Sequence, residues 1–174
     1  MDTFPFCGRC EYVNDAAKSG HLKCLKYHHK NGRPWNKWDK RTSIFAAENG
    51  HIEILKYLHE NGCPWDERAC AAAAKNGHIE ILKYLHEKGC PWDNWACNFA
   101  AENGHIEILK YLHEKGCPWN RQACAYAAKY GQLKCLKYLH ENGCPWDVSA
   151  YTYAKMNNHI DCVDYIFTKM NVHV

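Results

Sequence analysis

A segment of 27 residues repeats along most of the chain. Its second half, Gly-His-Ile-Glu-Ile-Leu-Lys-Tyr-Leu-His-Glu-x-Gly-Cys-Pro-Trp, occurs three times, with looser copies on either side. The six copies begin at Gly20, Gly50, Gly77, Gly104, Gly131 and Asn158. The step is constant except between the first two copies, where it is 30 residues. Repeats of this kind bury their apolar sides against their neighbours. We therefore predict one repeat array over residues 1–174, with approximate repeats 9–38, 39–65, 66–92, 93–119, 120–146 and 147–173.

Each repeat has the pattern of two short helices. Residues that favour helix N-caps follow the Pro-Trp step in four repeats, namely Asp66, Asp93, Asn120 and Asp147. An alanine-rich segment follows, and Gly77 marks its end in the third repeat, because glycine adopts a positive φ at low cost. Ile79, Leu82 and Leu85 then recur at helical spacing, and Pro91 prevents further helix. The sequence predicts an all-α solenoid of six stacked helix–loop–helix repeats.

The segment Ala73-Ala74-Lys75-Asn76-Gly77-His78-Ile79-Glu80-Ile81-Leu82-Lys83 resembles the ankyrin core Ala-Ala-x-x-Gly-His-Leu-Glu-Ile-Val-Lys. The resemblance covers roughly residues 9–173. Ankyrin repeats are about 33 residues long, so each repeat here lacks about six residues at the place of the ankyrin β-hairpin finger. The resemblance implies an ankyrin-like protein-binding scaffold with shortened or absent β-hairpin fingers. The Gly-Cys-Pro-Trp variant is similar to short ankyrin-like repeats of giant DNA viruses of amoebae and some protists, which implies a host protein as partner and the host cell cytoplasm as location.

Charge and hydropathy disfavour several classes of function. The net charge of +3 does not by itself indicate nucleic acid or an anionic membrane. The chain has no apolar run that could span a bilayer and no secretory signal, so we expect a cytoplasmic or nuclear protein. Basic residues do gather around Trp38, namely Lys23, Lys26, Lys30, Arg33, Lys37, Lys40 and Arg41. A nucleic-acid-binding repeat protein is therefore the alternative function. Acidic residues follow at once, from Glu53 to Glu67, so nucleic acid is the less favoured partner.

Most of the twelve cysteines follow the repeat. Ten occupy three recurrent positions: Cys63, Cys90, Cys117 and Cys144; Cys70, Cys97 and Cys124; and Cys24, Cys135 and Cys162. Stacked helices lie about 8–10 Å apart, whereas a disulfide needs Cα atoms within about 7 Å. We therefore expect these cysteines to be reduced, buried thiols without disulfides.

Cys7 and Cys10 lie outside this pattern. With Cys24 and either His28 or His29 they give the spacing Cys-x2-Cys-x13-Cys-x3-His, which is typical of a zinc site. Cys24 also fits a core position and His29 aligns with a recurrent histidine, so we expect no metal or cofactor and keep zinc as the alternative. The other histidines recur from repeat to repeat, whereas a catalytic site needs one distinctive cluster. We therefore expect no enzyme activity.

Positions that vary between repeats are candidates for partner recognition, because the constant positions maintain the stack. They fall on the first helix and its entry loop, which form the concave side of ankyrin solenoids. Trp, Tyr and Arg dominate binding hot spots. The predicted binding residues are Trp38, Arg41, Arg68, Trp95, Asn98, Arg121, Tyr126 and Tyr130. The sequence thus predicts a monomeric, non-enzymatic protein–protein interaction module.

Overall fold

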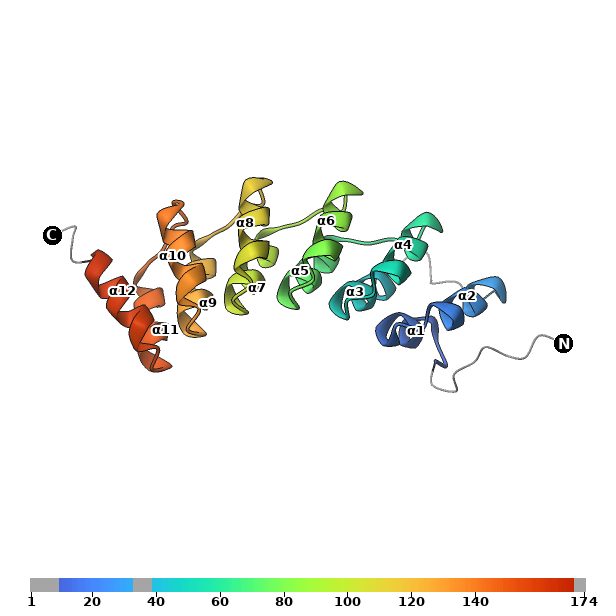
Figure 1. Ribbon diagram of the computed structural model, residues 1–174, viewed down its shortest axis with the longest axis horizontal. Coiled ribbons are helices and arrows are strands. Elements are labelled where there is room, and N and C mark those ends of the chain that lie inside the picture. The colour runs from blue at the N-terminus through green and yellow to red at the C-terminus, as the bar shows by residue number, and fades with distance from the viewer. Residues whose placement is uncertain (1–9, 33–38, 171–174) are drawn as a thin grey trace. The chain divides into compact units, whose positions relative to one another are not determined.

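The computed structural model describes residues 10–32 and 39–170. These residues form twelve α-helices in six pairs and contain no strand, which confirms the predicted all-α fold (Figure 1). The connectors 61–66, 88–93, 115–120 and 142–147 are therefore without the ankyrin finger. The helices are α1 (Val13–Ser19), α2 (Leu22–Lys30), α3 (Arg41–Glu48), α4 (Ile52–Glu60), α5 (Glu67–Lys75), α6 (Ile79–Glu87), α7 (Asn94–Glu102), α8 (Ile106–Glu114), α9 (Arg121–Lys129), α10 (Leu133–Glu141), α11 (Val148–Met156) and α12 (Ile160–Met170).

The helices fall into two compact units, residues 1–91 and residues 92–174, with three helix pairs in each. In the first unit, the first helices α1, α3 and α5 pack in sequence, and each second helix packs against the first helix of its own pair. The second unit repeats this arrangement, with α7, α9 and α11 as first helices and α8, α10 and α12 as second helices. Among the described residues, no helix combines the length and the apolar character that crossing a bilayer requires.

The residue after the Pro-Trp step caps the helix that follows, as predicted. Asp66 accepts a hydrogen bond from the backbone N–H of Arg68 at 3.1 Å. Asp93, Asn120 and Asp147 make the same bond at the starts of α7, α9 and α11. Such a side chain satisfies one of the amide groups that a helix start leaves without a partner, and it contributes about 1 kcal/mol. These caps therefore set where α5, α7, α9 and α11 begin.

The Gly-His step links neighbouring repeats in the first unit. Nε2 of His78 donates to the carbonyl of Glu48 at 3.1 Å, and Nε2 of His51 donates to that of Lys18 at the same distance. The ring of His78 lies against Gly50, whose φ is +81°, and a Cβ there would be 2.9 Å from Cε1 of the ring. Glycine is required at this position both by its left-handed backbone and by the close approach of the ring.

The core of each pair combines small and large apolar side chains. Ala73 and Ala74 of α5 are fully buried, which lets the first helices pack closely, and Leu82 and Leu85 of α6 are equally buried. The Trp of the connector joins successive second helices: His59 stacks on Trp65 with ring centroids 4.2 Å apart, and the Tyr84 ring meets the same indole edge-on. The recurrent aromatic and histidine residues are therefore part of the stack.

Candidate partner-binding surface

Arg41 and Arg68, two of the predicted binding residues, lie in the first turns of α3 and α5. Nε of Arg41 donates to Asp39 at 2.9 Å, and Nη2 of Arg68 donates to Asp66 at 2.8 Å. The hydrogen bond from the Arg41 side chain lowers the pKa of Asp39. Both arginines therefore pair with the carboxylate at the start of their own helix, although their side chains remain 67% and 61% exposed. Trp38, the predicted neighbour of Arg41, lies outside the described residues.

Trp95 and Tyr130 present exposed aromatic rings in the second unit. Trp95 lies in the first turn of α7 and is 41% exposed, and its ring packs against Phe99 at a centroid distance of 5.3 Å. Tyr130 follows the last turn of α9 and is 44% exposed, with Nζ of Lys129 lying 5.1 Å from its ring centroid. Both side chains can contact a partner without rearrangement of the helices.

Asn98 is buried, so this part of the predicted binding set is corrected. Its side chain is 0% exposed, and its Nδ2 donates to Oε1 of Gln122 at 3.4 Å. Ala71 and Ala125 hold the same position in other repeats and are also buried. The same position is half-buried at Ile44 and exposed at Thr152, so it is covered in some repeats and open in others, and at Asn98 the side chain is covered.

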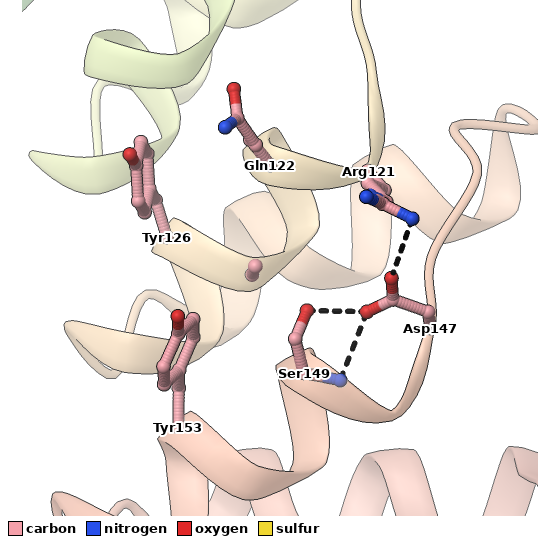
Figure 2. A pocket seen from close by; sticks show the side chains of 7 residues that line it. Arg121, Gln122, Tyr126, Asp147, Ser149 and Tyr153 are labelled. Carbon is pink, nitrogen blue, oxygen red and sulfur yellow. Dashed lines mark hydrogen bonds and ion pairs between the residues drawn. The ribbon is translucent and has the colours of Figure 1, made fainter.

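A pocket of about 270 Å³ lies between the start of α9 and the start of α11. Arg121, Gln122, Ala125 and Tyr126 line it from α9, and Asp147, Ser149 and Tyr153 line it from the α11 side (Figure 2). The rings of Tyr126 and Tyr153 lie on the same side of the two helices, and the ion pair of Arg121 and Asp147 lies at the other end of the pocket (Figure 2). The pocket thus combines two phenol groups with a charged pair.

The polar end of the pocket is set by the cap of α11. Asp147 accepts hydrogen bonds from the hydroxyl and the backbone N–H of Ser149, and these lower the pKa of its carboxyl group. Nη1 of Arg121 lies 3.4 Å from the same carboxylate, and the arginine side chain is 72% exposed. The lining contains no histidine, cysteine or lysine, and its ionisable groups are Arg121, Asp147 and the two tyrosines. The pocket can hydrogen-bond a bound segment through its hydroxyl, amide and guanidinium groups.

Tyr153, Gln122 and Ser149 belong to this surface but were not among the predicted binding residues. Tyr153 occupies the same position of its repeat as Tyr126, so the recurrence of a tyrosine there was the available signal. Gln122 and Ser149 likewise share one position, next to the cap. The sequence did not reveal that these two positions meet across neighbouring repeats.

Of the alternative zinc ligands, the structure brings Cys10 and Cys24 together, whereas His28 and His29 make other hydrogen bonds. Nε2 of His28 binds the backbone carbonyl of Cys10 at 2.9 Å, and Nδ1 of His29 binds the hydroxyl of Tyr57 at 2.8 Å. Cys7 lies outside the described residues. A different histidine, His21, lies next to Cys10 and Cys24. His21, and neither His28 nor His29, is therefore the histidine whose ring nitrogen lies beside the two sulfur atoms.

Comparisons with known proteins agree with this architecture. The family described as Ankyrin repeats (3 copies) matches residues 13–96 and again residues 97–174. A comparison with curated protein sequences finds no match. Repeats of this family are typically protein-binding scaffolds and are generally non-catalytic. On the evidence of the helix pairs, their caps, their Gly-His links and the two family matches, this chain belongs to the ankyrin repeat family.

Proposed function

We propose that the protein is a non-enzymatic scaffold that binds another protein through an aromatic face in residues 92–174. The aromatic face consists of Trp95, Tyr126, Tyr130 and Tyr153, together with the pocket described above. These side chains come from the first helices α7, α9 and α11 or from the residue that ends α9. The partner therefore meets the first helices, while the second helices serve the stack.

The exposure of Trp95 is the observation that carries this proposal. Trp65 and Trp146 are drawn into the stack by His59 and His140, whereas Trp95 projects from the first turn of a helix at 41% exposure. Tryptophan and tyrosine offer a large contact area at a low cost in side-chain entropy, which is why they dominate binding hot spots. An exposed Trp on one first helix, with exposed tyrosines on or next to the following first helices, is the composition expected of a protein-binding surface.

Two finer features of the partner follow from the sequence. The Gly-Cys-Pro-Trp form of the repeat, with its resemblance to repeats of giant DNA viruses of amoebae, supports a host protein as the partner. The many buried cysteines support a reducing compartment, the cytoplasm or the nucleus, where thiols persist. Both features define the lysate in which the partner should be sought.

A site-specific photo-crosslinker tests the face directly. With p-benzoylphenylalanine at Tyr126, a partner bound to the aromatic face should be crosslinked in an amoebal lysate. With the same group at Lys110, on the second helix α8, it should not. Lys110 is a matched control because it is exposed and pairs only at the surface, with Glu107 at 3.0 Å. Crosslinking of one protein from Lys110 but not from Tyr126 would place the partner on the second helices instead.

Removal of the aromatic anchors then measures their contribution. The double variant Trp95→Ala/Tyr130→Ala should weaken binding of the captured partner at least about 30-fold, because one hot-spot side chain contributes about 2 kcal/mol or more. Its melting temperature should stay close to that of the parent, since both side chains are largely exposed. Lys110→Ala should change neither quantity. Unchanged affinity in the double variant would contradict the proposed function.

A further inference from the structure

The first helix pair departs from the others just before its first helix. α5 begins at Glu67, ten residues before Gly77, whereas α1 begins only at Val13, seven residues before Gly20. Cys10 therefore lies in non-helical chain at the place where α5, α7, α9 and α11 begin. Its side chain is nevertheless fully buried.

Three metal-binding atoms meet at this place. Sγ of Cys10, a ring nitrogen of His21 and Sγ of Cys24 all lie within 4.8 Å of one another. The closest pair is Sγ of Cys10 and Nδ1 of His21, at 3.0 Å. Among the described residues, this is the only group of three cysteine, histidine or acidic side chains that meets in this way.

The spacing suits tetrahedral zinc. With Zn–S bonds of about 2.3 Å and Zn–N bonds of about 2.0–2.1 Å, tetrahedral ligands lie about 3.6 Å apart for a nitrogen and a sulfur and about 3.8 Å apart for two sulfurs. Cys10 and His21, 3.0 Å apart, have to open by about 0.6 Å to reach this geometry, and Cys24, within 4.8 Å of both, has to approach by at most about 1 Å. Thiolate and imidazole donors favour zinc, whereas magnesium, calcium and manganese favour oxygen donors.

The donors are held in place by the surrounding fold. His21 is the residue before α2 and Cys24 lies in its first turn, so both side chains are carried by one rigid element. The backbone of Cys10 is held by His28, whose Nε2 donates to the Cys10 carbonyl at 2.9 Å. Such an outer hydrogen bond fixes the position of a ligand before the metal binds.

His28 is itself an exception to the repeat. The other second helices carry an aliphatic residue at this position: Leu58, Leu85, Leu112, Leu139 and Ile166. His28 is 1% exposed, and burying an imidazole in an apolar core is unfavourable unless it makes hydrogen bonds. The hydrogen bond to the Cys10 carbonyl explains why this position carries histidine in place of an aliphatic residue. Two departures from the repeat, Cys10 and His28, therefore act on the same point of the structure.

The array contains an internal comparison for this cluster. The His-x2-Cys spacing of His21 and Cys24 recurs at His159 and Cys162, and Cys135 of α10 follows Gln132 at the same spacing. Among the described residues, no group of three metal-binding side chains forms at either of these places. The spacing alone thus reflects the repeat, and Cys10 is what distinguishes the first pair.

We propose that Cys10, His21 and Cys24 bind a zinc ion that fastens the segment before α1 to the start of α2. Binding releases the thiol protons of the two cysteines to solvent, and it replaces the Cys10–His21 contact with two metal bonds. The fourth ligand position of the tetrahedron is available to another donor, such as water. The role of the ion is structural, because it stands where the other repeats form a turn of helix.

Cobalt binding to the full chain, kept reduced and free of oxygen, tests the site. Co²⁺ added to metal-free protein should bind at about one ion per chain, with the absorption of thiolate-to-cobalt charge transfer, and zinc should displace it. Cys24→Ile and His21→Gln should each weaken this binding at least about 100-fold, because each removes a ligand. These replacements are the residues that the array itself uses at the same positions, Ile54 and Gln132, so both variants should keep the helical circular dichroism of the parent.

The controls are the equivalent changes elsewhere in the array. Cys135→Ile and His159→Gln alter the same two positions in repeats without the third donor, and both should bind Co²⁺ as the parent does. Gln132→His, which gives α10 the His-x2-Cys spacing, should add no second ion. The proposal is overturned if the parent takes up no cobalt or zinc, if folded Cys24→Ile binds as tightly as the parent, or if Cys135→Ile loses the ion as well.

Discussion

The first and the fifth helix pairs carry a cysteine at the same position of their second helices, and the two thiols have different surroundings. Cys24 of α2 is 2% exposed and Cys135 of α10 is 1% exposed. In α10, burial raises the pKa of Cys135 to about 11, as for a thiol that fills apolar space. In α2, the equivalent thiol lies beside Cys10 and His21. The comparison shows that neighbours from outside the repeat pattern decide what a recurrent residue can bind.

Backbone conformation accounts for this difference. Arg121 is ten residues before Gly131, as Cys10 is ten residues before Gly20. In the fifth pair that position starts helix α9, and the Arg121 side chain is 72% exposed. In the first pair the helix starts later, and the Cys10 side chain is 0% exposed. Equal positions in the sequence therefore point to solvent in one pair and into the core in the other.

The largest difference between the two pairs should appear when metal is removed. Free zinc at about 100 times its dissociation constant should stabilise the helices that bind it by about 2.7 kcal/mol. Removing the zinc with a chelator should therefore lower their free energy of unfolding by that amount. Hydrogen exchange should show lost protection in α1 and α2 and unchanged protection in α9 and α10. Cys24→Ile should not respond to the chelator. Equal loss in both helix pairs would contradict a local role for the ion.

A smaller effect is expected when the anchor of Cys10 is removed. His28→Leu replaces the buried imidazole with the residue used in four other pairs, and it removes the hydrogen bond to the Cys10 carbonyl. Zinc affinity should fall about 10- to 100-fold, as it does when outer hydrogen bonds to a metal site are lost. Competition with a chromogenic chelator measures this change. The metal-free variant should be at least as stable as the metal-free parent, so unfolding would not account for weaker binding. Unchanged affinity would show that His28 only fills space.

The smallest effect concerns the thiol of the fifth pair. The pKa of Cys135 is raised from 9.0 to about 11 by burial, so the folded protein holds this proton more tightly than the unfolded chain does. The associated stability is fully present below about pH 9 and is lost as the pH rises towards 11. Between about pH 9 and pH 11, the free energy of unfolding of Cys135→Ile should therefore fall by about 1–2 kcal/mol less than that of the parent. Urea unfolding of both proteins at several pH values measures the difference, and parallel curves would contradict the raised pKa.

The helices could be predicted closely because their signals are local. Asp66 caps α5, Gly50 and Gly77 follow α3 and α5, and the apolar spacing from Ile79 to Leu85 gives α6. Each of these signals acts over one or two helical turns, so a single sequence contains all of it. The stacking of pairs followed from the same spacing, since a short amphipathic pair must cover its apolar side.

The binding residues were predicted less well, because variation between repeats has more than one cause. Trp95 and Tyr130 vary and are exposed, whereas Asn98 varies and is buried. Exposure depends on which way a helix faces its neighbour, and two positions of one short helix can face opposite ways. Tyr153 joined Tyr126 at one pocket only because two neighbouring first helices place them on the same side.

The repeat, the helices and their caps were determined by the sequence itself, because each depends on residues that are close along the chain. The selection of His21 over His28 and His29 was made only by the tertiary structure. Cys10 precedes α1 and Cys24 lies in α2, and the packing of these two helices brings the two side chains together. Spacing along the chain does not specify which side chains face this point of contact. His21 looked like another member of the Gly-His series, and only its packing next to two sulfur atoms revealed a different chemistry.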